Sequence, residues 1–558
     1  MTKVYEHTIG RLVDSGVTTF AGMVGSTTAP YVARLGATPG ARYIGVRHEQ
    51  TAAALVDAAA RLTGRAGCLL THGASGALAA SLGVAAAARD FTPMVWISAT
   101  QERRALEQRW WQTLNVLGPA RDYVKWQARV ERPDRAPQAV DDAILAAVSG
   151  RPGVAQLDLP IDVSTAELAP SELPVRPALD AVTGSVPQPP ASAEDVQAAA
   201  AALGGARRPV LVVGAGVRYA GGQRAAERLA EAAGLAVVCT ANARGDVSET
   251  HEYSLGPSGI IGFEPASMAL RDADLVLAVG CRLSDMLTAR GEFLGRDVKV
   301  LHVDLCHDSI PTGVTDYRAI VADAGEFLEQ VTQAVLRGRA AIRPERVQWV
   351  RDAARKVAEW RDAWLLVRSE NGRVQPNEVV HAMRQQLRPD AVITHGAGDH
   401  GFYGTLLPVS RPGAHLMSVK LGAMGCGLGM AMGARLVAPR RQVLACLGDG
   451  ELMLQIGDLE TMVREQLPTV VVVFNNFRLG SQRRRVQAYG PAHGTDHGNP
   501  DFAALAQLFG AWGGRVDEPG QFADALKEAL AADRPAVIDV IVDPEARPRR
   551  IAVSREAT

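Results

Sequence analysis

Residues 443–476 read VLACLGDGELMLQIGDLETMVREQLPTVVVVFNN, and they are the most informative segment of this 558-residue chain. An apolar run enters a Gly-Asp-Gly turn (448–450), a helix-like stretch follows, and a second apolar run ends at two asparagines (475–476). Short β-branched runs on either side of a helix are typical of a parallel sheet covered by helices. Because parallel strands of such a unit end at the same sheet edge, we expect the Asp and an Asn amide to converge there.

The side chains at this edge suit a magnesium ion that holds a phosphate ester. Asp449 and Asn476 carry the hard oxygen ligands that Mg²⁺ prefers. Gly448 and Gly450 let backbone N–H groups approach a phosphate, aided by the N-terminus of the following helix. A Gly-Asp-Gly alone is usually just a turn, so the prediction depends on its distance to the paired asparagines and on the strand–helix–strand pattern between them.

The same alternation of short apolar strands and Ala-rich helical stretches extends over the whole chain. The strands form three groups, separated by a Pro-rich stretch at 161–193 and by residues 336–375, which pass from a basic segment into a helix-like one. We therefore predict an α/β protein with three Rossmann-like or flavodoxin-like doubly wound domains and mostly parallel sheets, at 1–165, 190–337 and 372–550. The predicted strands are 68–71, 94–98, 154–159, 210–213, 236–239, 275–279, 300–303, 391–394, 443–447, 470–474 and 537–542.

Composition argues against several classes of function. The 59 basic residues are balanced by 60 acidic ones, a net charge of -1, so a nucleic-acid partner is not expected. The apolar runs are too short to span a bilayer, and the N-terminus has no signal-peptide core, so no membrane partner is expected either. The six cysteines include no CxxC pair and indicate reduced thiols in a cytoplasmic protein.

The Gly-Asp-Gly turn and the two asparagines at this spacing resemble the thiamine-diphosphate motif of the acetolactate synthase and pyruvate decarboxylase superfamily. The resemblance implies thiamine diphosphate and Mg²⁺ as cofactors. It further implies that Asp449, the side chain of Asn476 and the backbone carbonyl of Arg478 ligate the metal. Gly448, Gly450 and Glu451 would lie against the cofactor. Glu451 is a departure, because Ser is common there and a carboxylate repels a diphosphate unless its side chain points away.

The first third of the chain supplies the partner motif, Arg47-His48-Glu49-Gln50, at the end of a strand and the start of an Ala-rich helix. In the family, the glutamate of this motif activates the cofactor through a hydrogen bond to its aminopyrimidine ring. Taken alone, a glutamate at a helix start more often caps the helix or interacts with its dipole. By the resemblance, residues 1–165 are the pyrimidine-binding domain, 190–337 a central Rossmann-like domain, and 372–550 the domain that binds diphosphate and magnesium.

Other segments resemble the family as well. They are AGMVGSTTAP (21–30), GAGDHGFYG (396–404) and LGAMGCGLG (421–429). The last resembles a turn whose methionine, here Met424, supports the bent cofactor. Without the resemblance, Met424 could equally be a core residue. The cofactor-binding residues implied by these segments are Gly25, Gly398, Asp399, His400, Gly422 and Met424.

The substrate side departs from the family pattern. His72 stands in THGASGALA, where the family has a small residue, and Trp110-Trp111 precede Gln112, the glutamine expected near the substrate. His72 could be an acid–base group at the reacting carbon, or it could simply hydrogen-bond its own loop. The basic run 483–485 could attract an anionic substrate, or it could be a solvated turn.

The middle third shows little sign of a dinucleotide site. Residues 210–222 (VLVVGAGVRYAGG) lack the GxGxxG spacing and a following acidic residue at the ribose distance. Some family members bind FAD in this domain, and residues 280–289 keep their Arg282 and Asp285. Because Leu283, Ser284 and Met286 differ, the sequence favours a central domain without bound FAD.

The resemblance implies a carboligase that decarboxylates a 2-keto acid such as pyruvate and transfers the acyl unit to an acceptor carbonyl. Glu49, Gln112 and His72 are its candidate catalytic residues. The alternative is a decarboxylase that releases an aldehyde, for which His72 would supply the proton. A silent binding homologue is a third possibility, disfavoured by the intact Glu49, Asp449 and Asn476. The resemblance also implies a homodimer or homotetramer with active sites between subunits.

Overall fold

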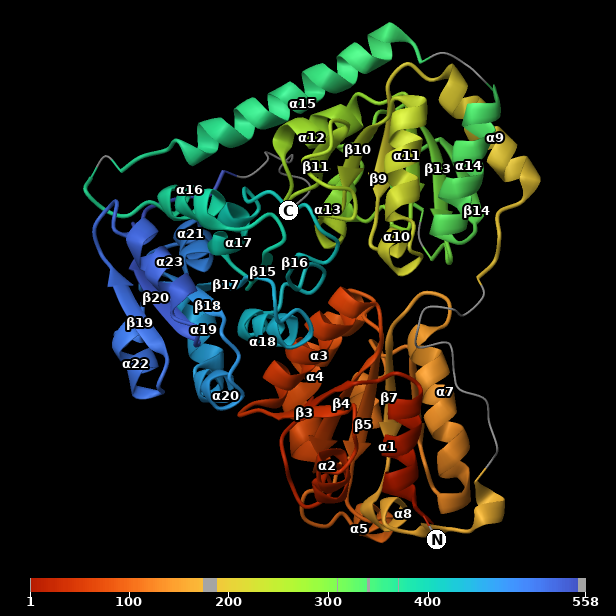
Figure 1. The fold of residues 1–558 in the computed structure, drawn as a ribbon, viewed down its shortest axis with the longest axis vertical. Helices are drawn as coiled ribbons and strands as arrows, with labels where there is room; N and C mark the ends of the chain where they lie inside the picture. The colour runs from red at the N-terminus through yellow and green to blue at the C-terminus, as the bar shows by residue number, and fades with distance from the viewer. Residues whose placement is uncertain (1, 174–187, 309, 339–341, 370, 550–558) are drawn as a thin grey trace.

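The computed structural model describes residues 2–173, 188–308, 310–338, 342–369 and 371–549, which fold into three α/β domains (Figure 1). Each domain contains a six-stranded sheet in which every neighbouring pair of strands is parallel. Helices cover the faces of the sheets, because the interior strands are apolar on both faces. The predicted fold class is therefore confirmed.

The N-terminal and C-terminal domains share one strand order. If strands are numbered within each domain, both sheets run 2-1-3-4-6-5, so the chain reverses direction between the first and third strands. Ligands of open parallel sheets bind outside the carboxyl ends of the strands at such a reversal. The N-terminal order is β3 (Arg42–Gly45), β2 (Thr19–Gly22), β4 (Gly67–His72), β5 (Met94–Ala99), β7 (Val154–Asp158) and β6 (Trp126–Arg129). The C-terminal order is β16 (His415–Leu416), β15 (Val392–His395), β17 (Val443–Gly448), β18 (Val470–Asn475), β20 (Ala536–Ile541) and β19 (Trp512–Val516).

The central domain has the Rossmann order, 3-2-1-4-5-6, with its reversal between β9 and β12. In the N-terminal domain, the first and last strands, β1 (Thr2–Lys3) and β8 (Glu167–Leu168), form a short antiparallel pair. The central strands in spatial order are β11 (Ser254–Pro257), β10 (Ala236–Cys239), β9 (Pro209–Val213), β12 (Leu275–Val279), β13 (Lys299–Asp304) and β14 (Asp316–Val321).

The helices follow the strands in the βα alternation that the sequence predicts. The N-terminal ones are α1 (Val4–Asp14), α2 (Ala29–Gly36), α3 (Glu49–Thr63), α4 (Gly73–Arg89), α5 (Arg103–Glu107), α6 (Leu117–Ala120), α7 (Ala136–Val148) and α8 (Ile161–Ser164). The central ones are α9 (Ala193–Gly205), α10 (Gly216–Tyr219), α11 (Gln223–Ala233), α12 (Glu264–Arg271), α13 (Asp285–Thr288) and α14 (Ala324–Gly338). The C-terminal ones are α16 (Pro376–Gln386), α17 (Asp399–Gly404), α18 (Gly427–Val437), α19 (Asp449–Gln455), α20 (Asp458–Arg464), α21 (Gly480–Gln487), α22 (Phe502–Leu508) and α23 (Phe522–Ala531).

The two linker-like stretches differ in structure. Of residues 161–193, the part at 174–187 lies outside the described residues, and the earlier part forms α8 and β8. Most of the second stretch is the 22-residue helix α15 (Pro344–Leu365), which crosses from the central to the C-terminal domain along one side of the molecule (Figure 1). Within the described parts of the chain, no helix is long and apolar enough to cross a membrane.

Helix α3 of the N-terminal domain packs closely on α18 of the C-terminal domain (Figure 1). Residues of both domains share one hydrophobic core along this contact. Gly429 and Gly433 face α3, and a Cβ on Gly433 would lie 2.1 Å from the backbone oxygen of Leu55. Glycines four residues apart therefore let the two helix backbones approach each other, which brings the start of α3 close to the C-terminal domain.

We expect Gly433→Ala to lower the free energy of unfolding by about 3 kcal/mol, because the new methyl group overlaps a backbone that cannot move freely. Gly204→Ala is the matched control, since nothing lies within 4 Å of a Cβ at that helical glycine. The control should be neutral or stabilising by up to about 1 kcal/mol. Urea unfolding of both variants measures the difference, and equal stabilities would contradict the close approach.

Candidate active site

The carboxyl ends of β15 and β17 form the chain reversal of the C-terminal sheet. These strands are hydrogen-bonded neighbours, and β17 pairs in turn with β18. The loops that leave them are the Gly-rich segment that begins at Gly396, the Gly-Asp-Gly turn, and the segment with the two asparagines. The motifs that the sequence analysis singled out in the last third of the chain therefore meet at one edge.

Asp449 begins α19 and is buried at this edge. Its Oδ1 accepts the backbone N–H of Gly450 (2.9 Å), and its Oδ2 accepts Nδ2–H of Asn499 (2.8 Å). The His497 ring nitrogen Nε2 lies 3.5 Å from Oδ2. Burial raises the pKa of the Asp449 carboxyl, since the few groups around it only partly replace water. A cation bound beside the Asp449 carboxylate would lower its pKa instead.

The two asparagines have different surroundings. Asn475 is fully buried: its Nδ2 donates to Asp539 (2.9 Å) and its Oδ1 accepts from Asn499 (2.9 Å), so it holds loops together. The Oδ1 of Asn476 accepts only the nearby backbone N–H of Arg478 (3.1 Å). Backbone hydrogen bonds of the residues on either side hold Arg478 opposite Asp496. The second asparagine is thus the better candidate ligand.

The donors at this edge fit a magnesium ion. Among the described residues, no three His, Cys, Asp or Glu side chains are grouped to hold a metal, so a metal here would depend on one carboxylate, one amide oxygen and a backbone carbonyl. Such a hard oxygen set with room for water and phosphate oxygens is the usual environment of Mg²⁺. Two buried polar atoms nearby, Nε2 of His400 and Oδ1 of Asn499, have no hydrogen-bond partner in the structure, which fits a polar group bound between the loops.

His400 lies in the first turn of α17, directly beside the Gly-Asp-Gly turn. A Cβ on Gly448 would lie 3.1 Å from Nδ1 of His400, and one on Gly398 would lie 2.9 Å from it. Burial lowers the pKa of His400 to about 4, so the ring is neutral near pH 7. A neutral imidazole that is protonated at Nε2 can donate a hydrogen bond to a diphosphate oxygen without adding charge.

Asp399 is held by Arg484 of α21, whose Nη2 donates to both carboxylate oxygens (2.8 and 2.6 Å). This pair neutralises a carboxylate that would otherwise repel a diphosphate beside His400. Arg483 pairs with Asp496 in the same way. Two of the three residues of the basic run 483–485 are therefore used in ion pairs that fix the loops, and Arg485 is exposed.

The carboxylate of Glu451 is surrounded by backbone N–H donors of two neighbouring segments. It accepts the N–H groups of Ala397 (2.7 Å), Gly427 (3.1 Å) and Cys426 (3.3 Å), and Glu451 is 1% exposed. It fills the space where a Cβ on Gly396 would be. Burial raises the pKa of Glu451 to about 7 against the pull of these N–H groups. The side chain thus joins the loop after β15 to the start of α18, both of which flank the candidate cofactor site.

The turn at 421–429 reaches across to the N-terminal domain. Gly422 has a φ of 62°, a left-handed conformation that favours glycine. The backbone carbonyls of Met424 and Gly425 accept Nε2–H of Gln50 (2.6 and 2.9 Å). Met424 therefore contacts Gln50, the residue that follows Glu49 in the chain.

Glu49 is the first residue of α3 and is 8% exposed. The helix is capped by His48, whose Nδ1 accepts the N–H of Gln50 (3.1 Å), so the carboxylate of Glu49 is not needed as the cap. That carboxylate reaches α4, because a Cβ on Gly76 would lie 3.0 Å from its Oε1. Because Gly76 has no side chain, space remains beside the carboxyl group of Glu49.

His72 ends β4, and Gly25 lies on the loop that follows β2, the other strand of the N-terminal chain reversal. Nδ1 of His72 lies 2.7 Å from the hydroxyl oxygen of Thr27, which itself donates to the carbonyl of Ala99 (2.5 Å), and 3.4 Å from the backbone nitrogen of Thr27. Thr27 therefore holds the imidazole through Nδ1, and Nε2 takes no part in these hydrogen bonds. A Cβ on Gly25 would overlap the imidazole ring, at 2.2 Å from Cγ.

Gln112 lies on the loop that follows β5 and has a φ of 58°. Its Oε1 accepts Nε2–H of Gln101 (3.2 Å), and its backbone carbonyl lies near Gly73, the residue after His72. The side chains of Trp110 and Trp111 beside it are 60% and 80% exposed. The structure thus brings Gln112 and His72 to one edge of the N-terminal sheet, where their hydrogen bonds are to residues of that domain.

Sequence analysis did not single out Asn499, and it named Arg484 only as part of the basic run 483–485. Asn499 joins Asp449 to Asn475, and Arg484 neutralises Asp399, yet both are far along the chain from their partners. The only available signal was that their loops follow strands of the same sheet. Their side chains could not be assigned from spacing alone.

A cavity of about 640 Å³ lies at the chain reversal of the central sheet, where all three domains contribute to its walls. The guanidinium of Arg282 lies over the ring of Phe91, 4.7 Å from its centroid. Burial lowers the pKa of Lys420, in the same wall, to about 8. Leu283, Ser284 and Met286, the positions that differ from FAD-binding sequences, all line this cavity.

Three family models match the chain in order. Residues 2–118 match the N-terminal TPP binding domain of thiamine pyrophosphate enzymes, 196–331 match their central domain, and 396–540 match their C-terminal TPP binding domain. The chain belongs to the thiamine pyrophosphate enzymes. The matched ranges contain Glu49 in the first domain, and Asp449 and Asn476 in the last.

Curated relatives of this thiamine pyrophosphate enzyme include acetolactate synthases. The large subunit of acetolactate synthase isozyme 3 from Escherichia coli K12 is 31% identical over 96% of this chain and 94% of its own length. The large subunit from Parasynechococcus marenigrum is also 31% identical, over 90% of this chain and 81% of its own. A probable large subunit from Methanocaldococcus jannaschii is 27% identical over 90% and 85%. The resemblance inferred from the motifs is thus confirmed, as an acetolactate-synthase-like enzyme that uses thiamine diphosphate.

Proposed function

We propose that this enzyme decarboxylates a 2-keto acid, pyruvate in the first instance, and transfers the acyl unit to an acceptor carbonyl, with thiamine diphosphate and Mg²⁺ as cofactors. The observation that supports this most is the meeting of Asp449, Asn476 and the loop of His400 at one sheet edge. The similarity to acetolactate synthases over nearly the whole chain supports the same reaction class.

Thiamine diphosphate, when bound, would supply a carbon acid whose deprotonated form can add to a keto carbon and take up the electron pair left by departing CO₂. Asp449, Asn476 and the carbonyl of Arg478 would hold Mg²⁺ on its diphosphate. Gly398, Gly448 and Gly450 leave room for that diphosphate, and His400 would hydrogen-bond it. We leave FAD out of the proposed cofactors, because Leu283, Ser284 and Met286 differ from the FAD-binding sequences.

The proton chemistry is assigned to side chains of the N-terminal domain. Glu49 would donate a hydrogen bond to the aminopyrimidine ring and so hold a proton where the cofactor needs it. Gln112 would orient the carboxylate or carbonyl of the substrate from the edge of the same sheet. His72 has its Nε2 outside the hydrogen bonds to Thr27, which suits the ring to hydrogen-bond a substrate or to exchange a proton with it.

The alternative function is a non-oxidative 2-keto acid decarboxylase, and His72 is the observation in its favour. A decarboxylase must deliver a proton to the carbon that lost CO₂, and an imidazole at the N-terminal sheet edge can do so. In the carboligase, the same position would serve to orient the acceptor. The two functions differ in product, so they can be separated directly.

Product analysis with pyruvate and a panel of acceptor carbonyls tests the proposal. CO₂ release with a ligated product, dependent on added thiamine diphosphate and Mg²⁺, is the expected result. Aldehyde in stoichiometric yield with CO₂ would instead establish the decarboxylase. A silent homologue would release no CO₂ from any 2-keto acid tested.

We further propose a homodimer or homotetramer whose active sites lie between subunits. Four exposed apolar side chains support it: Leu78 and Leu82 on α4, and Met453 and Leu454 on α19, each 43–56% exposed. Gln50 connects the two groups, since it contacts Gly83 and lies beside Gly425, which in turn lies next to Leu454. Contiguous exposed apolar side chains of this kind usually belong to an interface.

We expect Leu82→Arg to dissociate the oligomer and to abolish activity, because a charge would be buried in the interface. Leu508→Arg is the matched control, at a leucine that is 85% exposed on α22. Light scattering after size-exclusion chromatography measures the mass of each variant. An active monomeric parent, or a Leu82→Arg protein of unchanged mass, would contradict the proposed interface.

A cytoplasmic location is inferred from the thiols. All six cysteines are free, and Cys306 is exposed. Free, exposed thiols persist in reducing compartments. Fluorescent-protein fusion and cell fractionation would test this location.

A further inference from the structure

Three polar side chains on α19 and α20 are buried on the side that faces the N-terminal domain. Glu451, Gln455 and Asp458 are 1%, 3% and 1% exposed, and their spacing of four and three residues places them on one face. Glu451 holds loops of its own domain, as described above. The other two reach the N-terminal domain, and the proposed mechanism assigns them no role.

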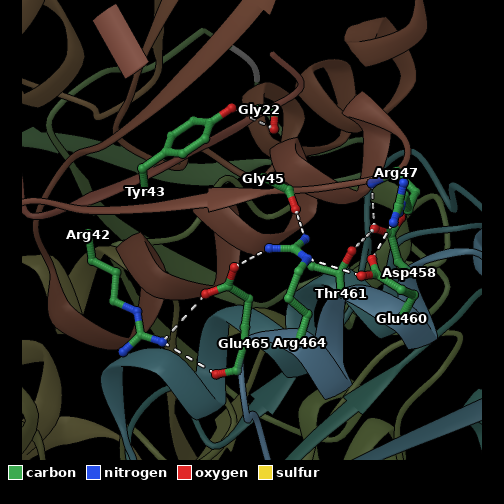
Figure 2. Close-up of polar contacts among 10 residues, drawn as sticks. All are labelled: Gly22, Arg42, Tyr43, Gly45, Arg47, Asp458, Glu460, Thr461, Arg464 and Glu465. Carbon is green, nitrogen blue, oxygen red and sulfur yellow. Dashed lines mark hydrogen bonds and ion pairs between the residues drawn. The ribbon is translucent and has the colours of Figure 1, made fainter. Parts of the chain in front are cut away.

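Asp458 accepts the backbone N–H of Arg47 at 2.8 Å, and the same oxygen accepts the hydroxyl of Thr461 at 2.8 Å (Figure 2). Arg47 comes two residues before Glu49. A carboxylate is costly to bury unless strong hydrogen bonds compensate for the lost water, and a charge-assisted bond to a backbone N–H is of that kind. The contact therefore fixes the backbone at the entry to α3.

Gln455 fixes the chain on the other side of Glu49. Its Nε2 donates to the hydroxyl of Thr51 (2.9 Å), and its Oε1 accepts the N–H of Leu428 at the start of α18 (3.2 Å). Gln50 adds its bonds to the carbonyls of Met424 and Gly425. Contacts from the C-terminal domain therefore bracket Glu49, at residues 47, 50 and 51.

We propose that Asp458, assisted by Gln455, is a positioning residue for Glu49: it sets where the activating carboxyl group lies by holding the backbone of the turn that carries it. The inference rests on the proposed function for its catalytic consequence. Small displacements of a catalytic group are costly, since a shift of about 1 Å can reduce a rate about 100-fold. Asp458 itself would touch neither cofactor nor substrate.

Nearby ion pairs provide a matched comparison. The Arg47 side chain pairs with Glu460 (2.9 Å), and the Arg42 side chain lies 3.8 Å from Glu465 (Figure 2). The arginine side chains are 59% and 54% exposed, so these pairs contribute little. Glu460→Gln removes a carboxylate two residues from Asp458 without touching the backbone of the turn.

The first test uses the apoprotein and does not depend on catalysis. We expect Asp458→Ala to raise the rate of amide hydrogen exchange in the peptide that carries Arg47 to Thr51 by at least about 10-fold, because an anchoring bond is lost. Glu460→Gln and Asp458→Asn should exchange like the parent, since Asn keeps an oxygen acceptor. Equal exchange in Asp458→Ala would overturn the proposal, even for a protein with no activity.

The second test concerns the consequence for catalysis in the holoenzyme. For Asp458→Ala we expect kcat and hydrogen exchange at C2 of the bound cofactor to fall about 10- to 100-fold. Its KM and its affinity for thiamine diphosphate should stay within about threefold of the parent, and Asp458→Asn should recover most of kcat. A parallel loss of cofactor affinity, or no change in kcat, would overturn the proposal. A parent without C2 exchange would instead count against the proposed function, and the amide-exchange result would still decide whether Asp458 holds the turn.

Discussion

Glu49→Gln is expected to slow hydrogen exchange at the thiazolium C2 of bound thiamine diphosphate by at least about 100-fold, with a matching loss of kcat. The amide has the size of the carboxyl group but cannot transfer a proton in the same way. Binding of thiamine diphosphate and Mg²⁺ should change little, because the proposed ligands of both lie on the C-terminal domain. Exchange measured by NMR, in parallel with cofactor affinity measured by calorimetry, separates the two effects.

The control for this prediction addresses the simpler role of a glutamate at a helix start. Glu6 occupies such a position in α1, where its Oε2 accepts the N–H of Lys3 (2.8 Å), so Glu6→Gln removes a capping carboxylate and nothing else. We expect Glu6→Gln to cost only about 1 kcal/mol of stability and to leave C2 exchange unchanged. If Glu49→Gln behaved in the same way, Glu49 would be a structural residue.

The strands predicted from sequence are interior strands of the three sheets. All eleven predicted strands are present. The strands of the three six-stranded sheets that were not predicted are the six edges and β2, and the short pair β1 and β8 was not predicted either. An interior strand is apolar on both faces, which produces the continuous runs that reveal it. Edge strands carry charges instead: β3 begins with Arg42, β6 ends with Arg129, and β14 begins with Asp316. The position of an edge strand depends on its hydrogen bonds to one neighbouring strand, and a run of apolar residues does not reveal those bonds.

The sequence predicted those residues of the candidate site whose place follows from where a strand ends. Asp449 and Asn476 follow strands, and the topology alone brings them together. Directions of side chains were not predictable, because they depend on partners from distant segments. Glu451 is the clearest case. It stands two residues after Asp449, yet its carboxylate accepts N–H groups from two other loops, and the absence of a side chain at Gly396 allows this.

The role of Asp458 could not be predicted from the sequence for the same reason, because it depends on the direction of a side chain. It stands in the segment with the strongest motif, but a carboxylate in an amphipathic helix usually faces solvent. Its partner is a backbone N–H in another domain, and backbone donors leave no trace in a sequence. The positions that hold a catalytic turn in place are therefore harder to read than the catalytic residue itself.

Asp449→Asn is expected to weaken Mg²⁺-dependent binding of thiamine diphosphate by at least about 100-fold, because the proposed metal site has a single carboxylate. Asn keeps the size of the side chain and one oxygen, so the fold should persist. Calorimetric titration of the apoprotein with cofactor, at several Mg²⁺ concentrations, measures the effect. Higher Mg²⁺ should recover part of the binding, since the amide oxygen remains a weak ligand.

Two comparisons give this result its meaning. Asp501→Asn is the matched control: Asp501 caps α22 by accepting the N–H of Ala504 (2.9 Å), and Asn is an equally good cap, so affinity should stay within about twofold. Glu49→Gln should bind cofactor but not exchange, whereas Asp449→Asn should fail at the earlier step. If Asp449→Asn bound the cofactor normally and lost only turnover, Asp449 would act on the reaction and not on the metal. The magnesium site would then have to be sought elsewhere at this sheet edge.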